Sequence, residues 1–275
     1  MATQAIPGGV FIERLLEELS IEDERSFRHV GMYADLKEVL RASSYRFRVL
    51  PGAGEARAAE PARWDRALLL NLTFWRPEDG GDVLVDETIP ADVVAHVAWH
   101  HLASRAFAGV TGQRPSVQAL FMGEAIASAF DIYLVGRLLG HAPESSFLET
   151  QVPAMKETAE AAGTDEEAFE ALLKDIAEAP ERAFAELREL LFDAANALFA
   201  SDTAAQAWTA LARLDHHRFA PLLHRYELSN WVLYARAYGG DVIVDARVRE
   251  VDEALRREAD PLAWLAKTWL GPRSG

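Results

Sequence analysis

Two apolar segments constrain this sequence most, because each has the composition of a buried helix but contains side chains that are costly to bury. Ala91–Phe107 contains His96 and His100, and Val117–Leu139 contains Glu124. On a helix, His96 and His100 lie one turn apart and face the same way. Burying two imidazoles and a carboxylate costs several kcal/mol unless they satisfy one another or hold a metal ion. The sequence therefore predicts that these three side chains meet.

The spacing of these side chains favours a metal site. Two histidines at positions i and i+4 can bind one metal ion from a single helical face, and a glutamate on the next helix can supply a third ligand. Two His and one Glu with an open fourth position are typical of catalytic zinc. We therefore predict His96, His100 and Glu124 as zinc ligands. Asp131, two turns after Glu124 on the same face, is predicted to orient a ligating histidine by accepting its second ring N–H.

The order of elements around these residues resembles the core of the gluzincin metallopeptidases. The resemblance rests on a strand hairpin, a His-x-x-x-His helix and a helix with the sequence Gly-Glu-Ala-Ile-Ala-Ser-Ala-Phe-Asp, and it covers roughly Leu68 to Leu139. This is about a quarter of the chain. The resemblance implies that His96, His100 and Glu124 are the three zinc ligands of a metallohydrolase-like core.

The sequence departs from this family at the position of the general base. In gluzincins an acidic residue directly follows the first histidine, and here that residue is Val97. A metal ion can still polarise a bound water molecule, but no local carboxylate accepts the proton. Ser128 also replaces an acidic residue usual four positions after the third ligand, with Asp131 three positions further on. The resemblance thus implies a degenerate zinc-binding relative with no assigned catalytic residue, and whether it is an enzyme stays open. If an open metal position is present, Val97→Glu is expected to create hydrolytic activity.

A second hypothesis needs no metal. The helix around Val93, Val94 and Leu102 is mainly a core element, and His96 can hydrogen-bond a carboxylate of the next helix directly. In that case the chain is a non-catalytic helical binding or scaffold protein with a structural His/Glu cluster. Its partner would be an unknown protein or small-molecule ligand.

Another group of metal-binding residue types occurs in the C-terminal half. Pro221 interrupts the helix on which its histidines would otherwise align, so we interpret this group as a surface cluster at a helix junction. Its members are Asp215, His216, His217, His224 and Glu227.

Composition narrows the classes of partner and site. The net charge of −15 argues against a nucleic-acid or anionic-membrane surface. The absence of cysteine excludes disulfides and thiolate metal sites, so any metal must be held by His, Asp and Glu. The first residues lack the pattern of a signal peptide, and we expect no apolar stretch long enough to span a membrane. These features predict a soluble, cytoplasmic protein.

Hydrophobic periodicity predicts an α+β fold that is predominantly α-helical. We expect strands over 45–50, 67–75 and 82–89, the last two forming a hairpin across the turn at 76–81. Residues 1–150 are predicted to form a mixed region with this small antiparallel sheet and the His/Glu-bearing helices. Residues 151–275 form an all-helical region that can pack into the same domain, with a boundary near 142–163. The expected helices are 10–19, about 22–42 with a break at Gly31, 91–107, 117–139, 168–177, 180–200, 202–214, 221–238, 246–258 and 261–270.

Overall fold

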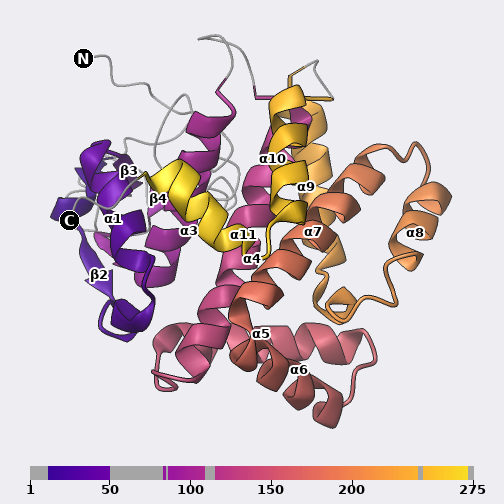
Figure 1. Cartoon of the computed structure of the whole chain (residues 1–275), viewed down its shortest axis with the longest axis horizontal. Coiled ribbons are helices and arrows are strands. Elements are labelled where there is room, and N and C mark those ends of the chain that lie inside the picture. Colours follow the sequence, from indigo (N-terminus) through magenta and orange to yellow (C-terminus); the bar gives the residue numbers. More distant parts are fainter. Residues whose placement is uncertain (1–11, 50–82, 85, 109–114, 241–243, 272–275) are drawn as a thin grey trace, which may run out of the picture.

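The computed structural model describes residues 12–49, 83–84, 86–108, 115–240 and 244–271. Over these residues the fold is α+β and predominantly helical, which confirms the predicted class. Small pieces of sheet lie at one side of the molecule, and long helices form the rest (Figure 1).

The N-terminal part combines short strands with one α-helix. Strand β1 (Ile12–Leu15) pairs antiparallel with β3 (Arg46–Val49), which pairs in parallel with β4 (Val83–Leu84). Strand β2 (Ser20–Glu22) pairs in parallel with β5 (Thr88–Pro90). The helical elements between these strands are the 3-10 turns η1 (Leu16–Glu18) and η2 (Ser26–His29) and helix α1 (Tyr33–Ala42).

The predicted helix over 10–19 is wrong for the residues described. Its apolar spacing suits a helix, but residues 12–15 form strand β1, in which Ile12 lies opposite Val49 and Leu15 opposite Arg46. Pairing with β3 satisfies the backbone of this segment and outweighs its local helical pattern. The helix expected over 22–42 is also shorter than predicted, because α1 begins only after the break at Gly31.

The sheet predictions are confirmed in part. The strand expected over 45–50 is β3. The strand expected over 67–75 and the turn at 76–81 lie outside the described residues. The segment expected as one strand over 82–89 forms two short strands, β4 and β5, which belong to different sheets.

Helix α4 (Val117–Leu139) is the centre of the core. Helix α3 (Ala91–Ala106) packs on one side of it and α7 (Pro180–Phe199) on the other (Figure 1). Ser116 caps α4 by accepting a hydrogen bond from Ala119 N at 3.1 Å. Contrary to our expectation, α4 is long and apolar enough to cross a membrane. However, 89% of its most apolar window is buried inside the protein, which is the environment of a core helix.

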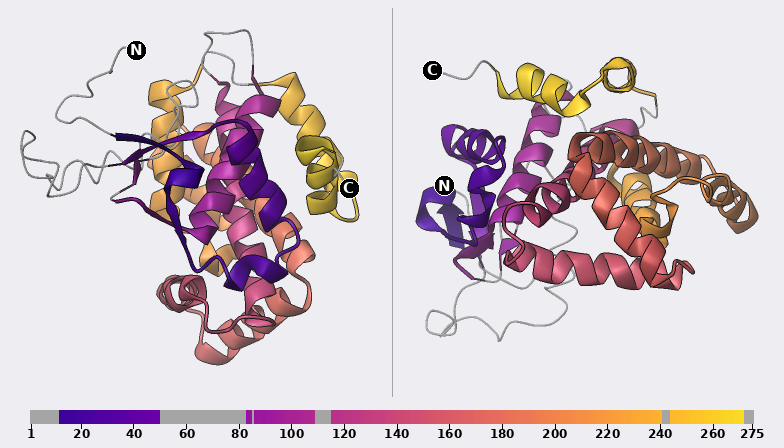
Figure 2. Two further views of the ribbon diagram at one scale, coloured as in Figure 1. Left: turned by 90° about the vertical axis from the view of Figure 1, so that its left-hand side faces the viewer. Right: turned by 60° about the horizontal axis from the view of Figure 1, so that its bottom comes forward.

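The remaining helices surround α4 and α7. Helix α5 occupies the segment in which we expected a domain boundary; its residues from 151 onward lie in the region predicted to be all-helical, whereas its first turn was not predicted. Views from two further directions show α5 and α6 together at one end of α4, and the C-terminal helices along its side (Figure 2). The bounds are α5 (Ser146–Ala161), α6 (Glu166–Glu178), α8 (Ala204–Ala212), η4 (Ala220–Leu222), α9 (Arg225–Tyr238), α10 (Ala246–Arg257), α11 (Pro261–Leu265) and the π turn η5 (Ala266–Leu270).

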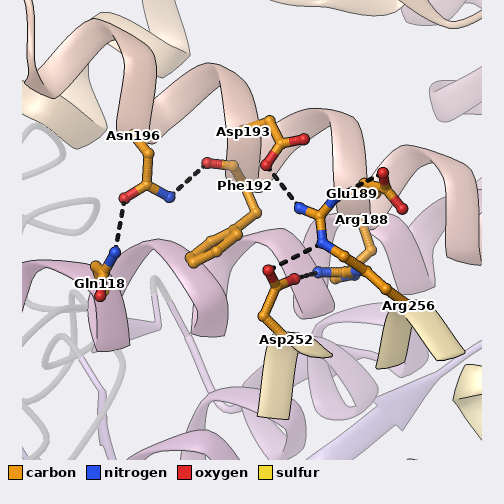
Figure 3. A network of polar contacts seen from close by, with 8 residues as sticks. All are labelled: Gln118, Arg188, Glu189, Phe192, Asp193, Asn196, Asp252 and Arg256. Carbon is orange, nitrogen blue, oxygen red and sulfur yellow. Dashed lines mark hydrogen bonds and ion pairs between the residues drawn. The ribbon is translucent and has the colours of Figure 1, made fainter. Parts of the chain in front are cut away.

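Ion pairs connect α10 with α7 (Figure 3). The guanidinium of Arg188 on α7 is only 1% exposed and donates to the carboxylate of Asp252 on α10. Arg256 on α10 also donates to Asp252, at 2.9 Å, and it reaches back to two acidic residues of α7. A buried arginine is tolerated only when its charge is paired, so this network fixes the position of α10. The two acidic partners on α7 are Glu189 at 2.5 Å and Asp193 at 2.6 Å.

Candidate metal centre

The packing of α3 against α4 brings together the three side chains that the sequence predicts as ligands. His96 Nε2 and His100 Nε2 lie 3.3 Å apart, and His100 Nε2 lies 3.5 Å from Glu124 Oε1. One potential ligand atom from each residue falls within 4.8 Å of the other two. Among the described residues, this is the one group of three or more His, Asp or Glu side chains that converge so closely.

Asp131 contacts the opposite side of the His96 ring. Its Oδ2 atom lies 3.0 Å from His96 Nδ1. A carboxylate at this distance favours the tautomer with the proton on Nδ1, because that nitrogen then donates to Asp131. The lone pair of a neutral His96 is then on Nε2, which faces His100.

The cluster is buried at one end and accessible at the other. The side chain of Glu124 is 5% exposed, that of His100 17% and that of His96 22%. Burial, and after it the neighbouring His96 ring, hold the pKa of His100 well below its ordinary value. The low pKa favours the neutral form of His100, which is the form of imidazole that binds a metal ion.

Asp92 extends the accessible row of α3, one turn before His96. Burial, followed by repulsion from Asp131, raises the pKa of Asp92 from 3.8 to about 6. Hydrogen bonds with backbone N–H groups at the start of α3 and the charge of His96 oppose this rise without cancelling it. Two carboxylates, Asp92 and Asp131, therefore repel each other beside the cluster when both are ionised.

Asp92→Asn is expected to stabilise the metal-free protein by about 1–2 kcal/mol at pH 7.5 and to have no such effect at pH 4. Because the pKa of Asp92 is higher in the folded state, the stability of the wild type falls as pH rises from about 4 to 6. The expected stabilisation is smaller than the pKa shift of Asp92 alone would give, because its side chain is partly exposed and solvent weakens the electrostatic effect. Urea unfolding with EDTA at both pH values measures the difference, and an effect of equal size at both would contradict the assignment.

Residue 97 is a buried residue of the hydrophobic core. Val97 is 1% exposed and belongs to the hydrophobic core, whereas His96 and His100 lie on the accessible side of α3. The third imidazole of the segment, His101, is not part of the converging group, and its ring packs edge-on against Tyr45 at 5.4 Å between ring centroids. The position at which gluzincins have their base is thus part of the core in this protein.

The C-terminal group of histidines and acidic residues, which we interpreted from the sequence as a surface cluster, forms no candidate metal site among the described residues. His217 Nδ1 accepts from Phe219 N at 3.2 Å, and His224 Nδ1 accepts from Glu227 N at 3.3 Å as the cap of α9. The carboxylate of Glu227 instead interacts electrostatically with His96 and Asp131. The sequence could not predict this interaction, because Glu227 and His96 are far apart in the chain and no local pattern connects α9 with α3.

Comparisons with protein-family models, with curated proteins and with solved structures found no match. The resemblance to gluzincins therefore rests on the converging group itself. What the structure supports is a possible metal-binding cluster of His96, His100 and Glu124.

Proposed function

We propose that the protein binds one zinc ion through His96, His100 and Glu124 and leaves a fourth coordination position open. The distances between the three side chains carry this proposal. Ligands about 2.0–2.1 Å from a tetrahedral zinc ion lie about 3.3 Å from one another. Two of the three separations in the cluster, 3.3 Å and 3.5 Å, are close to this ligand-to-ligand distance, and all three lie within 4.8 Å. The 3.5 Å separation between His100 and Glu124 is longer than the 2.7–3.2 Å usual for N–H···O hydrogen bonds, whereas the 3.3 Å contact between the two imidazole nitrogens also suits a hydrogen bond.

The donor set favours zinc over the hard cations. Magnesium and calcium prefer oxygen ligands, whereas two imidazoles and one carboxylate are a common set for zinc. Asp131 supports this role, because a carboxylate on the far nitrogen of a ligating histidine fixes the ring and increases its basicity. The His96 side chain is 22% exposed, so solvent water would reach the cluster from that side.

The relation to metallohydrolases is part of the same proposal. Two His on one helix and a Glu on the next, with an open position, suit polarisation of a carbonyl group or a water molecule. The alternative is a non-catalytic binding or scaffold protein. The 3.0 Å contact between His96 and Asp131 favours it, because that contact needs no metal ion.

Metal analysis of the full chain without a histidine tag tests this proposal. We expect one equivalent of zinc, and at least a 100-fold weaker zinc affinity in His96→Ala and in His100→Ala, measured by competition with a chromophoric chelator. Asp131→Asn is expected to weaken binding about 10- to 100-fold. His216→Ala, which removes an exposed histidine elsewhere, is the matched control. A folded wild type that binds no zinc, or ligand variants with wild-type affinity, would overturn the proposal.

A further inference from the structure

We propose that helix α8 is a docking surface for a second copy of this chain, and that two α8 helices pack antiparallel about a two-fold axis beside Trp208. Trp208 is the middle residue of α8 (Ala204–Ala212), and its side chain is 64% exposed. No other large apolar side chain among the described residues is exposed to a greater extent. A second molecule that covers this ring removes its apolar surface from water. The proposed dimer does not depend on the zinc site.

The outward side of α8 is uncharged and consists of small residues around Trp208. Among the described elements α8 packs chiefly against α7, and it lies at the right-hand edge of the molecule (Figure 1). Leu211 is the buried residue of α8 and belongs to the hydrophobic core. The helix contains no Asp, Glu, Lys or Arg, although the chain has a net charge of −15. Two such chains repel each other least where their surfaces carry no charge, so this helix is a favourable point of approach. Besides Trp208, the exposed residues of α8 are Ala204, Ala205, Gln206, Thr209 and Ala212.

Contacts within the chain hold Trp208 and α8 in place. The guanidinium of Arg225, in the first turn of α9, lies over the Trp208 ring at 4.8 Å from its centroid. Arg236 donates to Phe199 O at 3.1 Å and to Ser201 O at 2.9 Å, which fixes the link from α7 to α8. Because the ring is already held, it loses little conformational freedom when a partner covers it. Tryptophan and arginine are also among the side chains that contribute most to the binding energy of protein interfaces.

Opposite charges at the two ends of α8 favour a second copy in an antiparallel arrangement. Asp202 lies just before the helix and Arg213 directly after it, and both side chains are exposed. Neither makes an ion pair with another residue that the structure describes. Asp202 lies six residues before Trp208 and Arg213 five residues after it, so a two-fold axis at Trp208 places Asp202 of each copy beside Arg213 of the other. The helix dipoles also run in opposite directions in such a pair. This charge complementarity selects the same helix of a second copy as the partner.

The small size of α8 predicts a weak dimer. Its residues make a helix about 14 Å long. A standard protein interface covers about 800 Å² of each partner, which is more than one face of so short a helix provides. We therefore expect a reversible dimer with a dissociation constant of roughly 10–100 µM.

Sedimentation equilibrium of the full, untagged chain in EDTA, from about 1 to about 500 µM, measures this dissociation constant. Trp208→Ala is expected to raise it at least about 30-fold, because the substitution removes the central ring from both sides of the interface. Since Trp208 is exposed, the variant is expected to keep its fold, which circular dichroism checks. Leu233→Ala removes a side chain of α9 that is 62% exposed and is the matched control, with an unchanged dissociation constant.

Charge variants test the antiparallel arrangement separately. Asp202→Lys and Arg213→Glu are each expected to raise the dissociation constant about 5-fold, because each brings like charges together twice in the dimer. Asp202→Lys is expected to weaken the dimer although it makes the chain less acidic. Glu250→Lys changes the net charge equally at an exposed position of α10 and is expected not to weaken it. The double variant Asp202→Lys/Arg213→Glu exchanges the two charges and is expected to return to within about 2-fold of the wild type.

A wild type that remains a monomer up to about 500 µM would overturn the proposal, and α8 would then be a surface for a different protein. A dimer with the same dissociation constant in Trp208→Ala would also overturn it, because the two copies would then meet at another face. If the double charge variant dimerises more weakly than both single variants, the antiparallel pairing of Asp202 with Arg213 is wrong.

Discussion

Val97→Glu is expected to destabilise the protein by about 4 kcal/mol and to create no hydrolytic activity. The side chain of Val97 is 1% exposed within the core, so a glutamate there must lose its hydration and has more volume than the space allows. The sequence alone led us to expect the opposite result, because it placed residue 97 at the active site by analogy with gluzincins. Urea unfolding of the variant, together with the zinc-loaded hydrolysis assay, measures both effects.

Val97→Gln is the matched control, because it has nearly the same volume but cannot ionise. The glutamate must stay protonated in the folded core while it ionises in the unfolded chain above its ordinary pKa of about 4.3. The stability of Val97→Glu relative to Val97→Gln should therefore be greatest below pH 4 and fall as pH rises. A stable Val97→Glu variant with zinc-dependent hydrolysis would show that residue 97 does face the site.

The helical core could be predicted from the sequence because its signals are local. Ser116 and Gly140 bracket α4, and the apolar run between them is too long and continuous for a half-buried strand. The N-terminal strands could not be predicted in the same way. The segment 12–15 has helical spacing, and only its pairing with residues 46–49, far away in the sequence, makes it a strand.

The same distinction applies to the candidate site: features set by local spacing could be predicted from the sequence, and features set by helix packing could not. His96 and His100 are one helical turn apart, so their common direction follows from spacing alone, and Glu124 follows on the next helix of an antiparallel pair. The close approach of Gly239 on α9 to Val117 on α4 depends on how these two helices pack. The burial of Val97 likewise depends on which face of α3 packs inward. Neither kind of packing can be predicted from the sequence close to these residues.

Saturation with zinc is expected to raise the free energy of unfolding by about 4 kcal/mol when free zinc is 1,000 times its Kd. Without the ion, Glu124 is a buried carboxyl group beside the imidazole of His100, whose low pKa favours its neutral form. A dication at the three ligand atoms would compensate these groups only in the folded state, so its binding free energy adds to stability. Urea unfolding at a series of buffered zinc concentrations measures this gain.

Glu124→Gln should abolish most of this gain, because an amide oxygen binds zinc far more weakly than a carboxylate. The variant should also separate the zinc effect from the metal-free stability, since the amide fills the same buried space without a charge. Magnesium at the same free concentration is expected to give no stabilisation, because it binds imidazole poorly. An equal gain with magnesium, or in Glu124→Gln, would mean that the ion binds to other acidic groups of this chain of net charge −15 and not to the cluster.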